Sequence, residues 1–254
     1  MENQYQSRRQ IKRRAKAILR QPGMYKQLML ANLLPWLISV AFAFLAVYTV
    51  MQVMLAFGLE NVANNPNNFI DYYQGNTAVE QQTMLKSLIM LWFSQSITFT
   101  ALDLMRQPDQ TLSGWQVIFR TFNSRFFFGI LAVYIYTVVF ISLGLAAFVI
   151  PGIMLMFGLH VAYYVYYDGK THPDGRYFSA LTAVGRAWRM MRGHKFDYFV
   201  LQLTLIGWSL LETLTMHVFD VFIQPYLQLV DAGFYATVRQ QYDDEQAMLK
   251  DENM

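Results

Sequence analysis

Three ionisable side chains stand inside apolar segments of this sequence, and they are the first candidates for chemistry. His160 lies within a long charge-free run, whereas Glu212 and Asp231 interrupt apolar stretches near the C-terminus. Because a charged group in hydrocarbon is costly, such residues commonly face a bundle interior and belong to ion or proton pathways. They could form a proton or cation relay, or a pocket for a cationic group. Alternatively, each could make only a hydrogen bond that locks neighbouring helices together, which we favour for His160.

The depths of the two acids argue against a direct pair between them. Counted from a turn near residues 217–220, Glu212 and Asp231 lie at depths that differ by about 10 Å. Either the two acids act separately, or the turn lies elsewhere in the sequence.

The sequence lacks the signatures of the common enzyme classes. It contains no P-loop, G-x-S-x-G, H-E-x-x-H or dinucleotide-binding fingerprint. It also contains no cysteine, which excludes disulfides, thiol nucleophiles and cysteine-based metal sites. The His-Pro-Asp-Gly segment at 172–175 is more typical of a turn than of a metal site. We therefore expect no enzyme activity, no cofactor and no metal.

The composition of the chain is that of a membrane protein. Of its 254 residues, 55% are hydrophobic and only 15% are charged, against about 25% charged in soluble domains. Residues 27–59 and 126–167 contain no charged side chain, and an apolar run beyond about 18 residues is typical of a membrane span. The net charge of +3 comes from basic residues beside apolar runs. That placement indicates membrane topology and excludes nucleic acid as the expected partner.

Hydropathy and helix breakers divide the chain into six predicted spans. The run 126–167 would be about 63 Å long as one helix, twice a hydrocarbon core of about 30 Å, so it must turn back at Ile150-Pro151-Gly152. The predicted spans are 28–58, 84–104, 126–149, 152–167, 198–217 and 220–238, with an outer loop at 59–82, and they form one domain over 1–240 followed by an acidic tail at 241–254. The expected fold is an all-α polytopic helical membrane protein. Whether the sixth span fully crosses is left open, because Asp220, Pro225 and Asp231 interrupt it.

Basic residues predict the orientation of the spans. Segments 1–26, 106–125 and 168–197 contain nearly every Lys and Arg, whereas the predicted outer loop contains none. By the positive-inside rule, both termini should lie in the cytoplasm. The residues that could also contact anionic phospholipid are Arg8, Arg9, Lys12, Arg13, Arg14, Arg186, Arg189, Arg192 and Lys195.

Each odd-numbered span follows a short amphipathic segment. The predicted apolar faces are Ile11, Ala15, Ile18 and Leu19 in the first; Leu112, Trp115, Phe119 and Phe122 in the second; and Phe178, Leu181, Val184, Trp188 and Met191 in the third. One interpretation is a threefold repeat, in which an interfacial helix precedes a transmembrane hairpin and the three hairpins enclose a core that could bind a ligand. The alternative is that any basic loop before a span has this appearance.

Several segments together resemble a known family. They are Ile150-Pro151-Gly152-Ile153 with the tyrosine-rich end of the fourth span, Met191-Arg192-Gly193-His194-Lys195 before FDYFVLQLTLIGWSLL, and Gln224-Pro225-Tyr226 before Asp231-Ala232-Gly233-Phe234-Tyr235. This pattern is similar to the integral membrane family called domain of unknown function 975, found mainly in Gram-positive bacteria. Arg186-Ala187 and Met216-His217-Val218 depart from it, where the family has a serine and a Gly-rich turn. The resemblance implies a multi-span protein of the bacterial plasma membrane and no particular activity.

Two classes of function remain from the sequence. The first is a non-enzymatic accessory or binding protein of the plasma membrane, with a partner protein, a membrane-active peptide or a lipid as its ligand. The second is a small transporter or channel for a cationic or amphipathic solute that uses Glu212, Asp231 and His160. An intramembrane lipid-modifying enzyme ranks below both.

Overall fold

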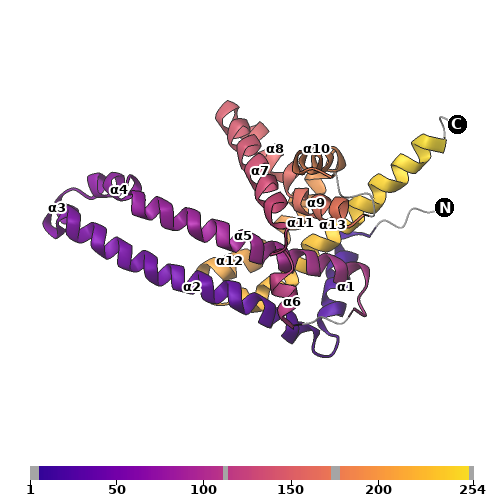
Figure 1. Cartoon of the computed structure of the whole chain (residues 1–254), viewed down its shortest axis with the longest axis horizontal. Coiled ribbons are helices and arrows are strands. Elements are labelled where there is room, and N and C mark those ends of the chain that lie inside the picture. The colour runs from indigo at the N-terminus through magenta and orange to yellow at the C-terminus, as the bar shows by residue number, and fades with distance from the viewer. Residues whose placement is uncertain (1–5, 111–113, 173–177, 252–254) are drawn as a thin grey trace.

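The computed structural model describes residues 6–110, 114–172 and 178–251, and every regular element in these ranges is a helix (Figure 1). In chain order they are α1 (Arg8–Leu19), α2 (Met24–Phe57), α3 (Leu59–Asn64), α4 (Pro66–Gln74), α5 (Thr77–Arg106), α6 (Gly114–Phe119), α7 (Phe127–Ala147), α8 (Val149–Leu159), α9 (Ala162–Thr171), α10 (Ala180–Met190), α11 (Lys195–Leu203), α12 (Ile206–Leu214) and α13 (Asp220–Asp251). The predicted all-α class is confirmed.

Four helical segments are long and apolar enough to cross a membrane. They are Met24–Phe57, Thr77–Arg106, Phe127–Ala147 and Val149–Thr171, and they correspond to the first four predicted spans. The predicted fifth span is divided between α11 and α12, and the sixth lies within α13. The chain is therefore a polytopic helical membrane protein by its fold, while the count of six stays a prediction.

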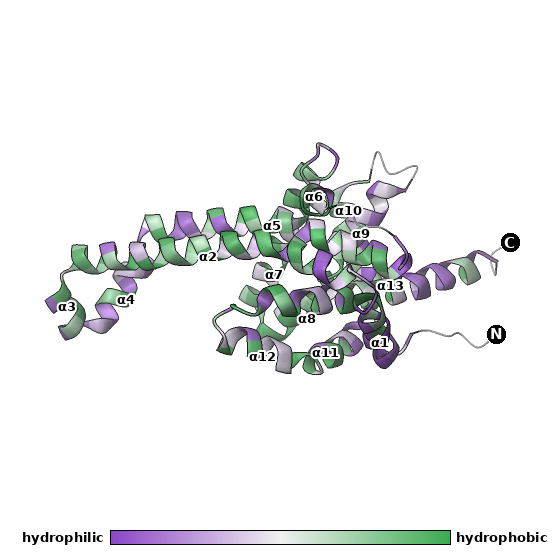
Figure 2. Ribbon diagram, turned by 90° about the horizontal axis from the view of Figure 1, so that it is seen from below, coloured by the Kyte–Doolittle hydropathy of each residue, from purple (hydrophilic) through white to green (hydrophobic). Residues whose placement is uncertain are grey.

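The helices form three hairpins (Figures 1 and 2). α2 and α5 make the longest, with α3 and α4 at its tip, α7 and α8 make the second, and α11 and α12 turn back into α13. α1, α6 and α10 each precede one hairpin and lie away from α3 and α4, at what we call the basal end (Figure 1). Hydrophobic residues dominate the α2–α5 hairpin, and hydrophilic ones dominate α1 and the last turns of α13 (Figure 2).

Two segments have more helix than the sequence predicts. The predicted outer loop 59–82 contains α3, α4 and the first turn of α5, which starts early because the side chain of Asn76 accepts a hydrogen bond from the backbone N–H of Ala78 at 3.0 Å. At the other end, α13 continues through most of the predicted acidic tail to Asp251. There Arg239 and Asp243, one helical turn apart, form an ion pair at 2.7 Å.

The turn between α7 and α8 falls slightly before the predicted one. Phe148 has an extended backbone and separates the two helices, so Pro151 lies in the first turn of α8. A proline there loses no helical hydrogen bond. Gly144 and Gly152 face each other across the turn, because a Cβ at Gly144 would lie 3.1 Å from the Gly152 Cα.

The N-terminal helix α1 packs mainly on α13. Ser7 caps it as expected, through a reciprocal pair of hydrogen bonds with Gln10. The buried residues of α1 are Ile11, Ala15 and Ile18, three of the four predicted. Gly233 of α13 permits the close approach, because a Cβ at this position would lie 2.8 Å from Ile11. The apolar face of α1 therefore contacts protein in addition to any lipid.

The buried faces of α6 and α10 differ from the predicted ones. In α6 the buried residues are Val117 and Ile118, whereas Phe119 and Phe122 are exposed; Leu112 and the Trp115 side chain lie outside what the structure describes. In α10 the buried face consists of Ala180, Ala183, Val184, Ala187 and Met190. The predicted Leu181 and Trp188 are exposed instead, because small side chains allow the closest helix packing in a membrane and large apolar ones can face lipid.

The orientation of the hairpins can be tested with single cysteines, because the natural chain has none. We expect cysteine in place of Asn67, in α4, to react in intact cells with a membrane-impermeant maleimide. Cysteine in place of Asp244, near the end of α13, should react only after the membrane is permeabilised. Labelling of position 244 from outside would contradict a cytoplasmic C-terminus.

Candidate functional site

The feature that organises the interior is a row of polar residues on α13. Asp220, Gln224, Gln228 and Asp231 follow one another at intervals of four, four and three residues, which places them on one face of the helix. The row is about 16 Å long at 1.5 Å per residue. We call it the polar face of α13.

A cavity of 370 Å³ lies against the part of this face formed by Gln224, Gln228 and Asp231, between α5, α7, α8 and α9. Its polar lining consists of Ser94, Gln95, Thr98, Thr137, His160, Gln224, Gln228 and Asp231, and its apolar lining includes Ile141, Met156 and Leu159. The polar residues come mainly from α5 and α13, and the apolar ones from α7 and α8. The cavity is therefore amphipathic, and its volume is within the range of about 300–1,000 Å³ typical of ligand sites.

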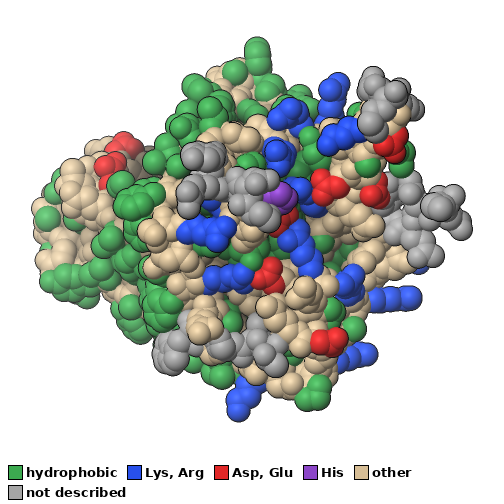
Figure 3. Space-filling model, turned by 45° about the vertical axis from the view of Figure 1, so that its right-hand side comes forward, with side chains coloured by type: hydrophobic (Ala, Val, Ile, Leu, Met, Phe, Trp, Pro, Cys, Tyr) green, Lys and Arg blue, Asp and Glu red, His purple; other side chains and the backbone are tan. Residues whose placement is uncertain are grey.

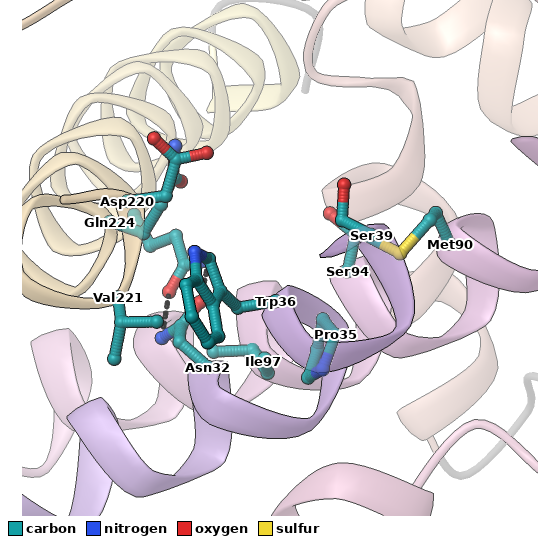
Figure 4. Close-up of a pocket in the computed structure, with 11 residues that line it drawn as sticks. Asn32, Pro35, Trp36, Ser39, Met90, Ser94, Ile97, Asp220, Val221 and Gln224 are labelled. Atoms are coloured by element: carbon teal, nitrogen blue, oxygen red, sulfur yellow. Dashed lines mark hydrogen bonds between the residues drawn. The ribbon is translucent and has the colours of Figure 1, made fainter. Parts of the chain in front are cut away.

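A second cavity of 210 Å³ adjoins the first and extends toward Asp220 (Figure 4). The two share Ser94, Gln224 and Gln228 in their linings. In Figure 4 Asp220 and Gln224 lie on one side of it, and Ser39 from α2 lies with Ser94 on the other. The polar face of α13 thus borders a chain of two connected hollows.

A reciprocal amide pair joins α2 to the middle of the polar face. The Asn32 Nδ2 donates to the Gln228 Oε1 at 3.2 Å, and the Gln228 Nε2 donates to the Asn32 Oδ1 at 3.0 Å. Asn32 is buried and also donates to the Leu28 carbonyl at 2.9 Å. Such pairing satisfies amide groups that lipid could not.

Two of the predicted site residues, His160 and Asp231, are brought together. The His160 Nε2 lies 3.8 Å from the Asp231 Oδ2 and 2.7 Å from the Tyr198 hydroxyl. The Gln202 Nε2 donates to the Tyr198 hydroxyl at 2.6 Å and to the Asp231 Oδ1 at 3.1 Å. These four side chains link the segment between α8 and α9 to α11 and α13 in one polar network, and two of them, His160 and Asp231, line the larger cavity.

The third predicted residue, Glu212, stands apart from this network. Its side chain is 8% exposed, and its Oε1 accepts a hydrogen bond from the Gln224 Nε2 at 2.9 Å. The turn after α12 includes Met216 and His217, both with positive φ. This turn lies close to residues 217–220, where the sequence predicts it. Glu212 and Asp231 have different hydrogen-bond partners, consistent with separate roles.

Some buried polar atoms beside the cavities have no hydrogen-bond partner among the described residues. They are the Gln95 Oε1 and Thr137 Oγ1 at the larger cavity and the Asp220 Oδ1 at the smaller one. Buried polar atoms in folded proteins are nearly always paired, and these three are exceptions that have almost no surface open to either cavity.

Beyond Asp231, toward the basal end, aromatic rings and ion pairs close the polar interior. The ring of Tyr235 on α13 stacks on Tyr164 with centroids 4.9 Å apart, and its hydroxyl donates to the Asp168 Oδ2 at 2.6 Å. Both carboxylate oxygens of Asp168 accept from Arg106 at 2.7 Å. This group, which we call the basal clasp, joins α5, α9 and α13.

A second ion pair supports the clasp. Asp103 of α5 pairs with Arg120 at 2.6 Å and accepts a hydrogen bond from the Tyr167 hydroxyl at 2.9 Å. Arg120 also bonds the Tyr167 hydroxyl and lies over its ring. The segment after α6 is thereby fixed to α5 and α9.

The basic residues predicted to contact lipid lie on α1 and around α10, where Lys and Arg gather on one face of the molecule (Figure 3). Some of them also have protein partners. Arg8 pairs with Asp197 at 3.2 Å, Lys12 donates to Thr204, and Lys195 lies over the Trp188 ring. Burial lowers the pKa of Lys195 and, with the nearby positive charges, that of Lys12.

Sequence reasoning missed the partners of the predicted site residues. Tyr198, Gln202, Gln228 and Asn32 are uncharged, and single amides or hydroxyls in apolar runs are common enough to attract no notice. The signal that could have found part of the site is the helical spacing of Asp220, Gln224, Gln228 and Asp231. The remaining histidines form no cluster with acids that could hold a metal among the described residues, and most of the His172–Gly175 segment lies outside them.

The basal clasp predicts a specific stability effect. Changing Asp168 to Asn removes the charge that Arg106 faces, and since the two side chains are 11% and 37% exposed, we expect a loss of about 1–3 kcal/mol. Thermal unfolding of the purified protein in detergent measures it. The matched control, Asp243→Asn in an exposed ion pair, should cost about 0–1 kcal/mol. Equal effects of the two changes would contradict a structural role for the clasp.

Comparison with known proteins gives one match. Residues 147–242 match a family model described as "Protein of unknown function (DUF975)". The matched stretch runs from the end of α7 into α13 and includes His160, Glu212 and Asp231. No curated protein and no solved structure matches the chain significantly. Over residues 147–242 the chain is therefore similar to this family of unknown function, as the sequence motifs in that region indicate.

Proposed function

We propose that this chain is a non-enzymatic binding protein of the bacterial plasma membrane, and that it holds a small amphipathic lipid between its hairpins. The supporting observation is the 370 Å³ cavity, whose lining is polar on the side of α5 and α13 and apolar on the side of α7 and α8. A molecule with a polar head and a hydrocarbon part would match both walls. Gln228 and Asp231 on the polar wall would then lie nearest the head.

The proposed orientation has both termini in the cytoplasm, with the basal end toward the anionic inner leaflet. The basic side chains of α1 and of the region around α10 support it, because cytoplasmic segments are rich in Lys and Arg. Arg9 and Arg13 are exposed on α1 and would contribute about 1 kcal/mol each from anionic headgroups.

A small transporter or channel is the second candidate function. It is favoured by the position of Asp231 and His160 inside the bundle, between the hollow that extends to Asp220 and the basal clasp. Transport would require the clasp to open. Flux of a solute across vesicles that contain only the purified protein would favour this candidate over a purely binding role.

The binding proposal predicts that filling the cavity expels its ligand. Ser94 lines both hollows, so Ser94→Phe should fill part of this space. We expect the wild type to co-purify with a stoichiometric amount of lipid and the variant to lose it. Native mass spectrometry of protein purified from its own membranes in mild detergent measures this. The matched control is Ser87→Phe, on the same helix but exposed, which should retain the lipid. A wild-type protein without any bound molecule would contradict the proposal.

A further inference from the structure

The hydrogen bonds around Asp231 leave its carboxylate without a cation in hydrogen-bonding contact. The side-chain nitrogen of Gln202 has two hydrogens, and it donates one to the Tyr198 hydroxyl and one to the Asp231 Oδ1. The Tyr198 hydroxyl also shares a hydrogen bond with the His160 Nε2, 2.7 Å away.

The His160 Nε2 is hydrogen-bonded to the Tyr198 hydroxyl, and its separation of 3.8 Å from the Asp231 Oδ2 is too long for a hydrogen bond. Among the described residues, Asp231 thus accepts one hydrogen bond, from Gln202, and no lysine or arginine pairs with it. A carboxylate inside a membrane protein normally has a cationic partner, because an unpaired charge in low dielectric is costly.

The surroundings of Asp231 determine what kind of cation would fit. The wall opposite the polar face of α13 is formed by Ile141, Met156 and Leu159, which would contact a hydrocarbon chain and not a hydrated inorganic ion. An ammonium group has several N–H donors to satisfy, and the carboxylate of Asp231 lines this cavity.

We propose that the cavity recognises an organic amine, with its ammonium group against Asp231 and its hydrocarbon part against the wall of α7 and α8. This inference rests on the proposed binding function and specifies the charge of the ligand. This mode of binding requires an uncharged His160, with the Tyr198 hydroxyl donating to its Nε2. Glu212, whose partner is Gln224 outside this network, has no part in recognition.

The test compares two probes with the same hydrocarbon chain, one with a charged headgroup and one with a neutral headgroup. Decylamine, which is protonated at pH 7, and decanol are each equilibrated with the protein in phosphatidylcholine nanodiscs, and empty nanodiscs supply the blank for partition into lipid. Because a buried charge pair is worth 2 kcal/mol or more, we expect the amine to bind at least about 30-fold more tightly than the alcohol. Asp231→Asn should remove this preference and leave alcohol binding within about twofold of the wild-type value.

The control variants locate the effect. Glu212→Gln should keep the preference for the amine, and Asp231→Glu, which retains the charge, should keep most of it. Equal binding of amine and alcohol by the wild type would overturn the inference and leave the binding proposal intact, whereas binding of neither would overturn both. If Glu212→Gln alone lost the preference for the amine, the ammonium would be recognised by Glu212 and not by Asp231, and the inference would be wrong. If Asp231→Asn does not fold, the wild-type ratio and the Asp231→Glu variant still decide.

Discussion

The polar face of α13 cannot be exposed to hydrocarbon, and the arrangement of the other helices follows from that constraint. Two carboxylates and two amides lie along one side of this helix, and lipid offers none of them a hydrogen bond. The first two hairpins enclose them: α2 through Asn32, α5 through Ser94, and the α8–α9 segment through His160. A helix that would be unstable alone in a bilayer thereby becomes the centre of the bundle.

The outer surface follows the opposite rule. Large apolar side chains such as Phe44, Phe128 and Leu143 are 73%, 71% and 62% exposed, which would be costly in water but suits contact with lipid. At the basal end Asp168 and Asp103 have arginine partners, whereas the buried Glu212 is hydrogen-bonded to Gln224. The molecule is thus polar at its axis and its base and apolar on its flanks, and the cavity lies where these two environments meet.

Much of the fold could be predicted because the bilayer imposes simple signals. Charge-free runs located the first, third and fourth spans, hydropathy located the second, and the break near Pro151 fell within a few residues of its predicted place. The faces of α6 and α10 could not be predicted in the same way. In a membrane both buried and lipid-facing positions are apolar, so hydrophobicity does not tell Ala183 from Leu181; only packing does. The candidate site was also predictable only in part. The cost of a buried charge drew attention to Asp231, His160 and Glu212. Their uncharged partners come from distant segments that only the tertiary structure brings together.

If the polar face of α13 borders an accessible cavity, single cysteines along this helix should differ in their reactivity, in nanodiscs, toward a small water-soluble thiol reagent. We expect cysteines replacing Gln224 and Gln228 to react, whereas those replacing Leu229 and Val230, which are fully buried against other helices, should not. Equal reactivity at all four positions, or none at Gln224 and Gln228, would contradict this expectation.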